Sequence, residues 1–315
     1  MKRLFNILLA GTLLTTGLVA CEKSVEDVHY VPTTPVGKLL LEECPEVARM
    51  FRDTTFLVTV GVEETDLHIQ TNDGYVNQVY IIKVDTNVPG VRMAVSMPYN
   101  SNNISGGWNR QTLTDMAKWM DAPGERVAAM VNGDFWQMSA PINPRGPVHR
   151  GGVVIYDEWD FDEAVNQQAL SFIGILDDGS MFIAERARYE EYKDRLIECT
   201  GAGVMMLADG VNMGGTYPEN QRDPRTSIGY TDDGVVYLLT CDGRRTFGAA
   251  GMTYKEIGAI FQTLGCERAA NLDGGGSAQM LIRHPIADVW QIRNRPSDGA
   301  ERPVINGWAV IVEEP

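Results

Sequence analysis

Three consecutive glycines lie between a carboxylate and a hydroxyl near the end of the chain, from Asp273 to Ser277. Three glycines together lose much conformational entropy on folding, so some function must need backbone without Cβ atoms there. Without Cβ atoms, successive N–H groups can converge on one oxyanion, with the carboxylate and the hydroxyl at the edges. The run therefore predicts an anion-binding site. The alternative is a flexible turn between two strands, at 269–272 and 278–282.

Three further polar segments follow or enter predicted strands. They are Asn132-Gly133-Asp134-Phe135-Trp136, the segment 222–230 with two arginines and two hydroxyls, and Cys241-Asp242-Gly243-Arg244-Arg245. Guanidinium groups bind phosphate through paired hydrogen bonds, and hydroxyls complete the oxygen shell. Hairpin geometry can bring Arg225 and Asp242 to the same end of a sheet. The alternatives are an Asn-Gly turn, surface arginines paired with Asp223, and an Asp-Gly turn.

The elements that position these segments are mostly strands. Apolar, β-branched runs flank Asn72-Asp73-Gly74, Asp177-Asp178-Gly179 and Asp232-Asp233-Gly234, which predicts three antiparallel hairpins. Helices are predicted over 253–264, where Thr253 and Glu256 form a capping box, and over 113–120. This order predicts an α+β fold with a mixed, largely antiparallel sheet and a few packed helices.

The ends and the composition limit what the chain can do. Lys2, Arg3 and an apolar run ending at Cys21 predict a lipoprotein signal peptide over residues 1–21, with Cys21 as the lipidated residue. A tether is predicted over 22–37, an N-terminal strand-rich scaffold or lid over 38–123, and a catalytic domain over 124–315. A net charge of -15 argues against a nucleic-acid binder and against membrane binding other than through the lipid anchor. The predicted location is the bacterial cell envelope, periplasmic or at the outer membrane.

The polar segments, taken in order, resemble a known family. The motifs from 132 to 136, 225 to 229, 242 to 244 and 271 to 277, followed by Arg302-Pro303-Val304-Ile305-Asn306, are similar to those of the phosphodiester glycosidases. The resemblance spans about 127–312, and Asp134 stands where the family has a small residue. It implies hydrolysis of the C1–O bond of a sugar 1-phosphodiester, such as N-acetylglucosamine-1-phospho-6-mannose, to free sugar and a phosphomonoester.

The departing phosphomonoester is already a stable anion, so stabilisation of phosphate matters more than protonation of the leaving group. The candidate catalytic residues are Asp273, Asp242 and Asp134. The candidate substrate-binding residues are Asn132, Gly133, Trp136, Arg225, Ser227, Arg244, Asn271, Gly274, Gly275, Gly276, Ser277 and Arg302. The expected partner is a sugar-phosphate diester or phosphoglycan substrate.

This reaction requires no cofactor and no metal, although a divalent cation is an alternative if Asp134 converges with Asp242 or Asp273. Two rival functions remain: a non-catalytic glycan-binding surface lipoprotein, and a phosphodiesterase that cuts the P–O bond. Convergence of Asp273, Asp242 and Arg225 in one cleft would favour an enzyme over a binding module.

Overall fold

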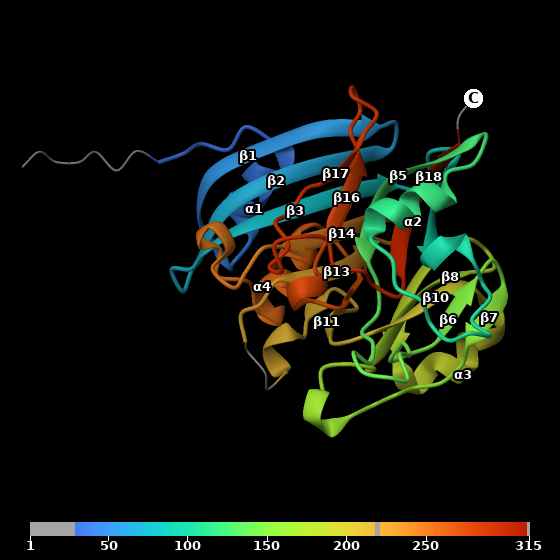
Figure 1. Cartoon of the computed structure of the whole chain (residues 1–315). Coiled ribbons are helices and arrows are strands. Elements are labelled where there is room, and N and C mark those ends of the chain that lie inside the picture. Colours follow the sequence, from blue (N-terminus) through green and yellow to red (C-terminus); the bar gives the residue numbers. More distant parts are fainter. Residues whose placement is uncertain (1–28, 218–220, 314–315) are drawn as a thin grey trace, which may run out of the picture.

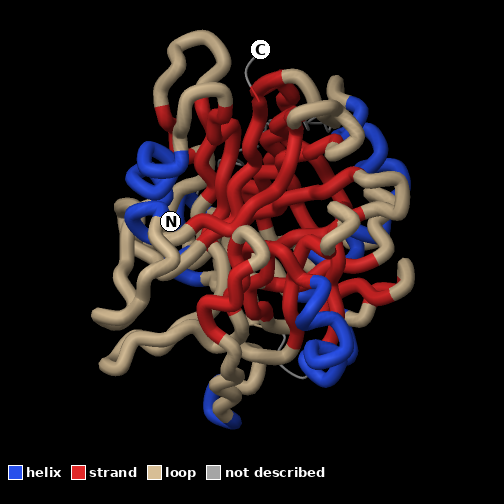
Figure 2. Tube along the Cα trace, turned by 90° about the vertical axis from the view of Figure 1, so that its right-hand side faces the viewer, coloured by secondary structure: helices blue, strands red, loops and turns tan. Residues whose placement is uncertain are grey.

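Antiparallel β-sheet makes up most of the molecule. The computed structural model describes residues 29–217 and 221–313, in which strands occupy the interior and helices lie at the periphery (Figure 1, Figure 2). Every pairing between these strands is antiparallel. The predicted α+β fold with largely antiparallel sheet and few helices is confirmed. The predicted signal peptide, including Cys21, lies outside the described residues.

The largest sheet has eight strands and contains two of the three predicted hairpins. Its strands, in spatial order, are β1 (Val47–Thr59), β2 (Val62–Thr71), β3 (Val76–Asp85), β14 (Val235–Cys241), β13 (Arg225–Tyr230), β15 (Arg268–Asn271), β11 (Met205–Ala208) and β12 (Val211–Asn212). The turns at 72–74 and 232–234 join β2 to β3 and β13 to β14, as their Asp-Gly sequences predict.

Two five-stranded sheets complete the fold. One contains β7 (Val153–Tyr156), β6 (Val148–Arg150), β10 (Leu196–Ala202), β8 (Ser171–Leu176) and β9 (Met181–Glu185), with the third predicted hairpin turn between β8 and β9. The other contains β17 (Trp290–Ile292), β16 (Met280–Arg283), β5 (Glu125–Asn132), β18 (Gly307–Glu313) and β4 (Val91–Ser96).

The sheets run across the domain boundary that the sequence predicts at 123/124. β3 pairs with β14, and β18 pairs with both β4 and β5. Residues 38–123 therefore share two sheets with the rest of the chain. The predicted tether also overlaps helix α1 (Pro35–Glu43), and just before that helix the carboxylate of Asp53 in β1 accepts hydrogen bonds from Tyr30, Thr33 and Thr34.

The two predicted helices form as expected. In α4 (Tyr254–Thr263), Thr253 and Glu256 make the reciprocal capping box, and Gly265 follows in the left-handed region with φ of +80°. Helix α2 (Leu113–Met120) is capped by Thr112. The remaining described α-helix is the short α3 (Tyr189–Tyr192). The apolar face of α4 packs on the sheet around β11 and β15.

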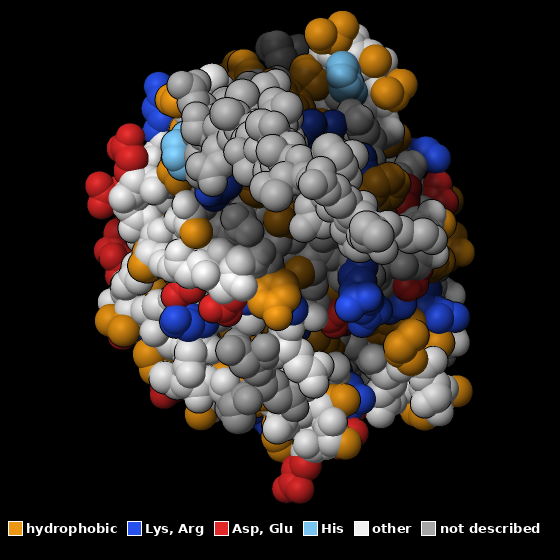
Figure 3. Space-filling view, turned by 90° about the vertical axis from the view of Figure 1, so that its left-hand side faces the viewer, with side chains coloured by type: hydrophobic (Ala, Val, Ile, Leu, Met, Phe, Trp, Pro, Cys, Tyr) orange, Lys and Arg blue, Asp and Glu red, His pale blue; other side chains and the backbone are white. Residues whose placement is uncertain are grey.

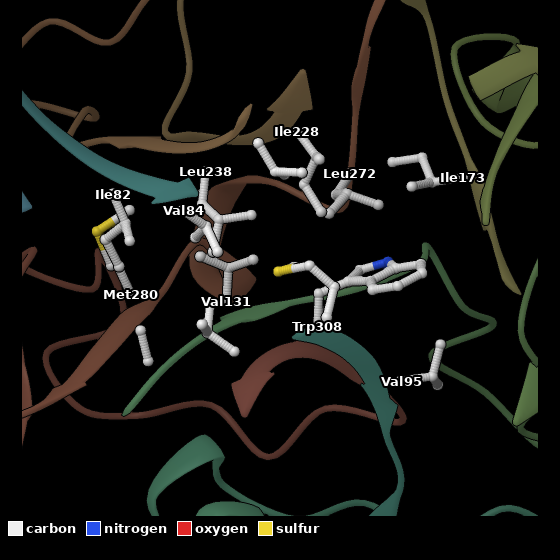
Figure 4. Close-up of a cluster of buried hydrophobic side chains, with 14 of the residues drawn as sticks. Ile82, Val84, Val95, Val131, Ile173, Ile228, Leu238, Leu272, Met280 and Trp308 are labelled. Atoms are coloured by element: carbon white, nitrogen blue, oxygen red, sulfur yellow. The ribbon is translucent and has the colours of Figure 1, made fainter. Parts of the chain in front are cut away.

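The main core lies between the sheets (Figure 4). It joins Ile82, Ile228 and Leu238 of the eight-stranded sheet to Val131 and Trp308 of the five-stranded sheet that contains β5 and β18. The indole N–H of Trp308 donates to Thr200 Oγ1 at 2.9 Å, so this buried polar group is satisfied. All four described cysteines are buried thiols without disulfide bonds. Within the described residues, no helix combines the length and the apolar character that crossing a bilayer requires.

Glu64, Asp66 and Arg293 form a buried ionic triad. Its two carboxylates lie in β2, where Glu64 pairs with Ile82 and Asp66 with Tyr80 of β3. Arg293 donates from Nε to Glu64 Oε1 and from Nη2 to Asp66 Oδ2, both at 2.6 Å. Burial and the charge of Asp66 raise the pKa of Glu64, against the opposing charge of Arg293. Because Arg293 directly follows β17, the triad ties the N-terminal strands to the segment that leads to Arg302.

Candidate active site

The glycine run lies under two arginine side chains. A Cβ atom on Gly275 would lie 2.5 Å from Nη2 of Arg244, and one on Gly276 would collide with the guanidinium of Arg302. Gly275 also has φ of +60°, which residues with a Cβ rarely adopt. The N–H groups of Gly274, Gly275 and Ser277 bond to protein oxygens. The close approach of two cations therefore requires the glycines, whereas three N–H groups of the expected anion nest already have acceptors.

Each arginine is held by one carboxylate that remains partly exposed. Arg244 donates from Nε and Nη2 to the two oxygens of Asp223, at 2.8 and 3.1 Å. Arg302 donates from Nε to Asp298 at 2.7 Å and from Nη1 to Ser277 Oγ at 3.2 Å. A guanidinium has five N–H donors, so both side chains keep donors for an oxyanion.

Asp273 is the carboxylate at the centre of this arrangement. Burial raises its pKa to about 6, although hydrogen bonds from Ser277, the Gly274 N–H and the Trp136 indole and the charge of Arg302 oppose the rise. Its charge also helps to raise the pKa of Arg244, for which the main cause is the hydrogen bond to Asp223. Asp273 thus ionises near neutral pH within reach of two cations.

Asn132 fixes the backbone of the site. Its Nδ2 donates to the carbonyl oxygen of Asp273 at 2.6 Å, while its Oδ1 accepts from Thr226 Oγ1 at 2.7 Å and from the Gln279 N–H at 3.0 Å. Gly133 is equally enclosed: its carbonyl accepts from the Asp273 N–H, and a Cβ atom there would collide with Asn306. Asn132 was predicted to bind substrate, and the structure places its amide in this internal network.

Asp134 lies behind the site, with 2% of its surface exposed. Its Oδ2 accepts from the Gly146 N–H at 2.8 Å, and its own N–H donates to Asn306 Oδ1. Burial raises its pKa to about 8, and the charge of Asp273 adds to the rise. Asp134 is therefore near enough to Asp273 to influence it electrostatically but is not open to a substrate in this conformation.

Asp242 is fully buried. Its Oδ1 accepts from the Arg295 N–H at 2.7 Å, and Tyr80 donates to Oδ2 at 3.4 Å. Burial raises its pKa to about 6, against these hydrogen bonds. Asp242 thus anchors the segment after β17 through the Arg295 N–H.

Arg225, Ser227 and Asn271 lie on the face of β13 and β15 that packs against α4. All three guanidinium nitrogens of Arg225 are occupied, by Met252 O, Tyr254 OH and Gln221 O. Asn271 donates to Leu272 O at 2.7 Å, and Ser227 pairs directly with Asn271 across the sheet. Convergence of Asp273, Asp242 and Arg225 in one cleft was the observation expected to favour an enzyme. The guanidinium of Arg225 instead bonds to protein oxygens on the α4 side. The cations that act on Asp273 are Arg302 and Arg244.

Trp136 contributes its N–H rather than its ring face. The side chain is 6% exposed, and Arg110 lies 5.2 Å from the ring centroid. Its indole N–H bonds to Asp273. The ring of Trp136, a predicted substrate-binding residue, therefore offers no open face to a sugar in this conformation.

Four residues of the site were not predicted: Thr226, Asp223, Asp298 and Asn306. The alternation of a strand offers Thr226 as the one side chain of 225–227 that points opposite to its neighbours. Asp298 and Arg302 form an ion pair at the turn that follows β17. Within the described residues, no group of three or more His, Cys, Asp and Glu side chains is placed to hold a metal ion.

Comparison with known proteins agrees with the motif order. The family model of the phosphodiester glycosidases matches residues 125–311. A curated relative, the SPbeta prophage-derived uncharacterized protein YomE of Bacillus subtilis (strain 168), is 28% identical over 216 residues, which is 65% of this chain and 30% of that protein. The chain thus spans less than a third of this relative's length.

Solved structures share the fold at low sequence identity. The catalytic domain of zebrafish N-acetylglucosamine-1-phosphodiester alpha-N-acetylglucosaminidase, auto-inhibited by its pro-peptide, aligns with a TM-score of 0.59 and 16% identity, over 84% of this chain and 89% of that one. A hypothetical protein from Synechocystis aligns with a TM-score of 0.57 and 16% identity, over 84% of this chain and 64% of that one.

Proposed function

Because this chain belongs to the phosphodiester glycosidase family, we propose that it hydrolyses the glycosidic C–O bond of a sugar 1-phosphodiester. The observation that carries the proposal is Asp273, a carboxylate with a pKa raised to about 6, beside two guanidinium groups over a glycine run. The products would be free sugar and a phosphomonoester.

The two arginines would hold the phosphate. Arg244 and Arg302 are each fixed by an aspartate and keep unused N–H donors, which suits a phosphate whose negative charge grows as the C–O bond breaks. Preorganised cations stabilise this charge without rearrangement during the reaction. Asp298 and Asp223 would act by orienting the arginines.

Asp273 would act at the sugar C1. When ionised, it can stabilise the positive charge that develops at C1, attack C1, or direct a water to it. Hydrogen bonding from Ser277 and Trp136 lowers its pKa and so favours the ionised form. An acetamido oxygen of the substrate would be an alternative nucleophile, with Asp273 then assisting that group.

The test is to incubate the purified protein with N-acetylglucosamine-1-phospho-6-mannose in ¹⁸O water and to locate the label in the products by mass spectrometry. Label in the sugar supports the proposed C–O cleavage. Label in the phosphate would instead identify a phosphodiesterase, and no turnover of this or other sugar phosphodiesters would leave the glycan-binding function. Addition of EDTA should leave the rate unchanged, since the proposal uses no metal.

We also propose that Cys21 carries a lipid that anchors the mature protein in the bacterial cell envelope. Metabolic labelling with a fatty-acid analogue should mark the wild-type protein and not the Cys21→Ser variant. Labelling of both proteins, or of neither, would contradict the anchor.

A further inference from the structure

A second cleft adjoins the proposed catalytic site. It has a volume of about 600 Å³, within the range of small-molecule sites. Its walls are the β2–β3 turn with Tyr75, the loop after β14 with Arg244 and Arg245, and Arg222. Because Arg244 also lies over Gly275, the cleft and the proposed phosphate site share one side chain.

The two walls are joined by backbone hydrogen bonds. The Ala250 N–H donates to Val76 O, and the Asp242 N–H donates to Gln78 O, each at 3.0 Å. The β2–β3 turn therefore lies beside the loop after β14, on the left of Figure 1. This turn belongs to the part of the chain that precedes the family match, which begins at residue 125.

The ring of Tyr75 forms a fixed platform in the cleft. The guanidinium of Arg222 lies 4.0 Å from the ring centroid, and Arg222 is itself held by paired bonds to Glu256 and by Asp73. The tyrosine remains 47% exposed. A rigid, half-exposed aromatic ring is a surface on which a sugar ring can stack.

Arg245 supplies the unbalanced charge. Carboxylates neutralise Arg222 and Arg244, whereas the exposed side chain of Arg245 has no hydrogen bond or ion pair among the described residues. Acidic and basic side chains otherwise lie close together on this side of the molecule (Figure 3). An unpaired cation in a cleft of a protein with net charge -15 favours a local anionic ligand.

The backbone of this loop is held in an uncommon conformation. Arg244, Arg245 and Phe247 have φ of 55°, 63° and 48°, the left-handed region that residues with side chains seldom occupy. Such conformations persist where surrounding structure enforces them and gather at ligand sites. Here the conformation places two consecutive arginines along one cleft.

We propose that this cleft binds the leaving-group side of the substrate, with its sugar ring on Tyr75 and a second anionic group against Arg245. The position of the scissile phosphate at Arg244 rests on the function proposed above. The substrate would then be a charged glycan, in which the sugar beyond the scissile phosphodiester carries a further phosphate or a carboxylate.

The test compares three N-acetylglucosamine-1-phosphodiesters in which the alcohol esterified to the phosphate is methyl mannoside, the same mannoside with a second phosphate, or a methyl glucuronide. We expect wild-type kcat/KM to be about tenfold or more higher for at least one charged leaving group. Arg245→Ala should reduce this ratio to near one. Arg92→Ala, which removes an exposed arginine paired with Glu125, is the control and should keep the wild-type ratio.

The charged substrate that is preferred identifies phosphate or carboxylate as the second anion. Equal kcat/KM for all three substrates in the wild type, or a ratio retained in Arg245→Ala, would overturn the charge assignment. For the platform, Tyr75→Leu should raise KM several-fold while Tyr75→Phe should not. Unchanged KM in Tyr75→Leu would remove the ring from the site.

Calorimetry distinguishes failure of the proposed hydrolysis from failure of the proposed second anion site. If none of the three compounds is hydrolysed, mannose 1,6-bisphosphate and mannose 1-phosphate are titrated into the wild-type and Arg245→Ala proteins. An about tenfold tighter binding of the bisphosphate that the variant loses supports the second anion site without catalysis. Equal affinity of the two compounds for the wild type overturns it.

Discussion

Arg293 and Arg302 lie in one segment of the chain, yet their carboxylate partners give them different capacities. Arg293 is held by Glu64 and Asp66, whose side chains are 0% and 12% exposed. Arg302 is held by Asp298, which is 39% exposed, and by the hydroxyl of Ser277. The first arginine joins two parts of the fold, whereas the second keeps donors that a substrate can reach. The exposure of the partner thus separates a structural arginine from a candidate functional one.

The largest expected effect is at Asp273, the carboxylate on which the charge of Arg302 acts. Asp273→Asn should reduce kcat by about 10²- to 10⁴-fold while leaving the protein folded. The amide keeps the size of the side chain and removes the charge that the mechanism uses. Steady-state kinetics and circular dichroism measure the two effects. Near wild-type turnover in the folded variant would remove Asp273 from the chemistry.

Arg293→Ala should act on the other side of the contrast and destabilise the protein by about 3–5 kcal/mol, because two buried carboxylates lose their cation. Urea unfolding followed by tryptophan fluorescence gives the free energy of unfolding. The matched variant Arg92→Ala removes an exposed pair and should cost at most about 1 kcal/mol. Similar losses for the two variants would mean that the triad contributes no more than a surface pair.

Arg302→Lys should lower kcat/KM by about tenfold to a hundredfold with little change in stability. Lysine keeps the charge but cannot bind Asp298, Ser277 and a phosphate through one planar group. The comparison variant is Arg225→Lys, since Arg225 faces α4 and should affect stability more than kcat/KM. A larger loss of kcat/KM in Arg225→Lys than in Arg302→Lys would indicate that Arg225 binds the phosphate.

The smallest expected effect concerns pH. The pKa of Asp134 is raised to about 8, so the folded state binds more protons than the unfolded state between about pH 4 and 8. The contribution of Asp134 to stability is therefore largest at low pH and is lost as pH rises toward 8.

Asp134→Asn resembles the protonated acid and should melt higher than wild type at pH 8.5 but not at pH 5. Thermal unfolding measures this difference, since each kcal/mol of unfolding free energy shifts the melting temperature by about 2–4 °C. An equal difference in melting temperature at both pH values would show that Asp134 does not titrate in this range.

Local sequence patterns were sufficient for much of the fold. The Asp-Gly turns predicted the hairpins, and Thr253 with Glu256 predicted the start of α4, because each depends on residues within one or two turns of chain. The glycine run and the resemblance located Asp273 and the nearby arginines. The same patterns led to a predicted boundary at 123/124 and did not predict that β3 and β4 pair with strands beyond it, since such pairing depends on distant parts of the chain.

The orientation of side chains was the main gap at the site. Strand alternation shows that Arg225 and Ser227 share a face and that Thr226 lies on the other, but not which face meets Asn132. The structure brings Thr226 to Asn132, and α4 covers the opposite face, where Arg225 bonds to Tyr254. Likewise, the approach of Asp298 to Gly276 depends on the fold around the segment and has no signal in the glycines themselves.

The position of β18 has a consequence for how the protein is made. This strand pairs with β5 on one side and β4 on the other, although both are synthesised long before it. Each of them therefore waits with an unpaired edge, and such edges invite pairing with other chains. We expect the last strand to act as a cooperative closing step, so that a chain truncated before Gly307 would aggregate rather than form a smaller folded protein.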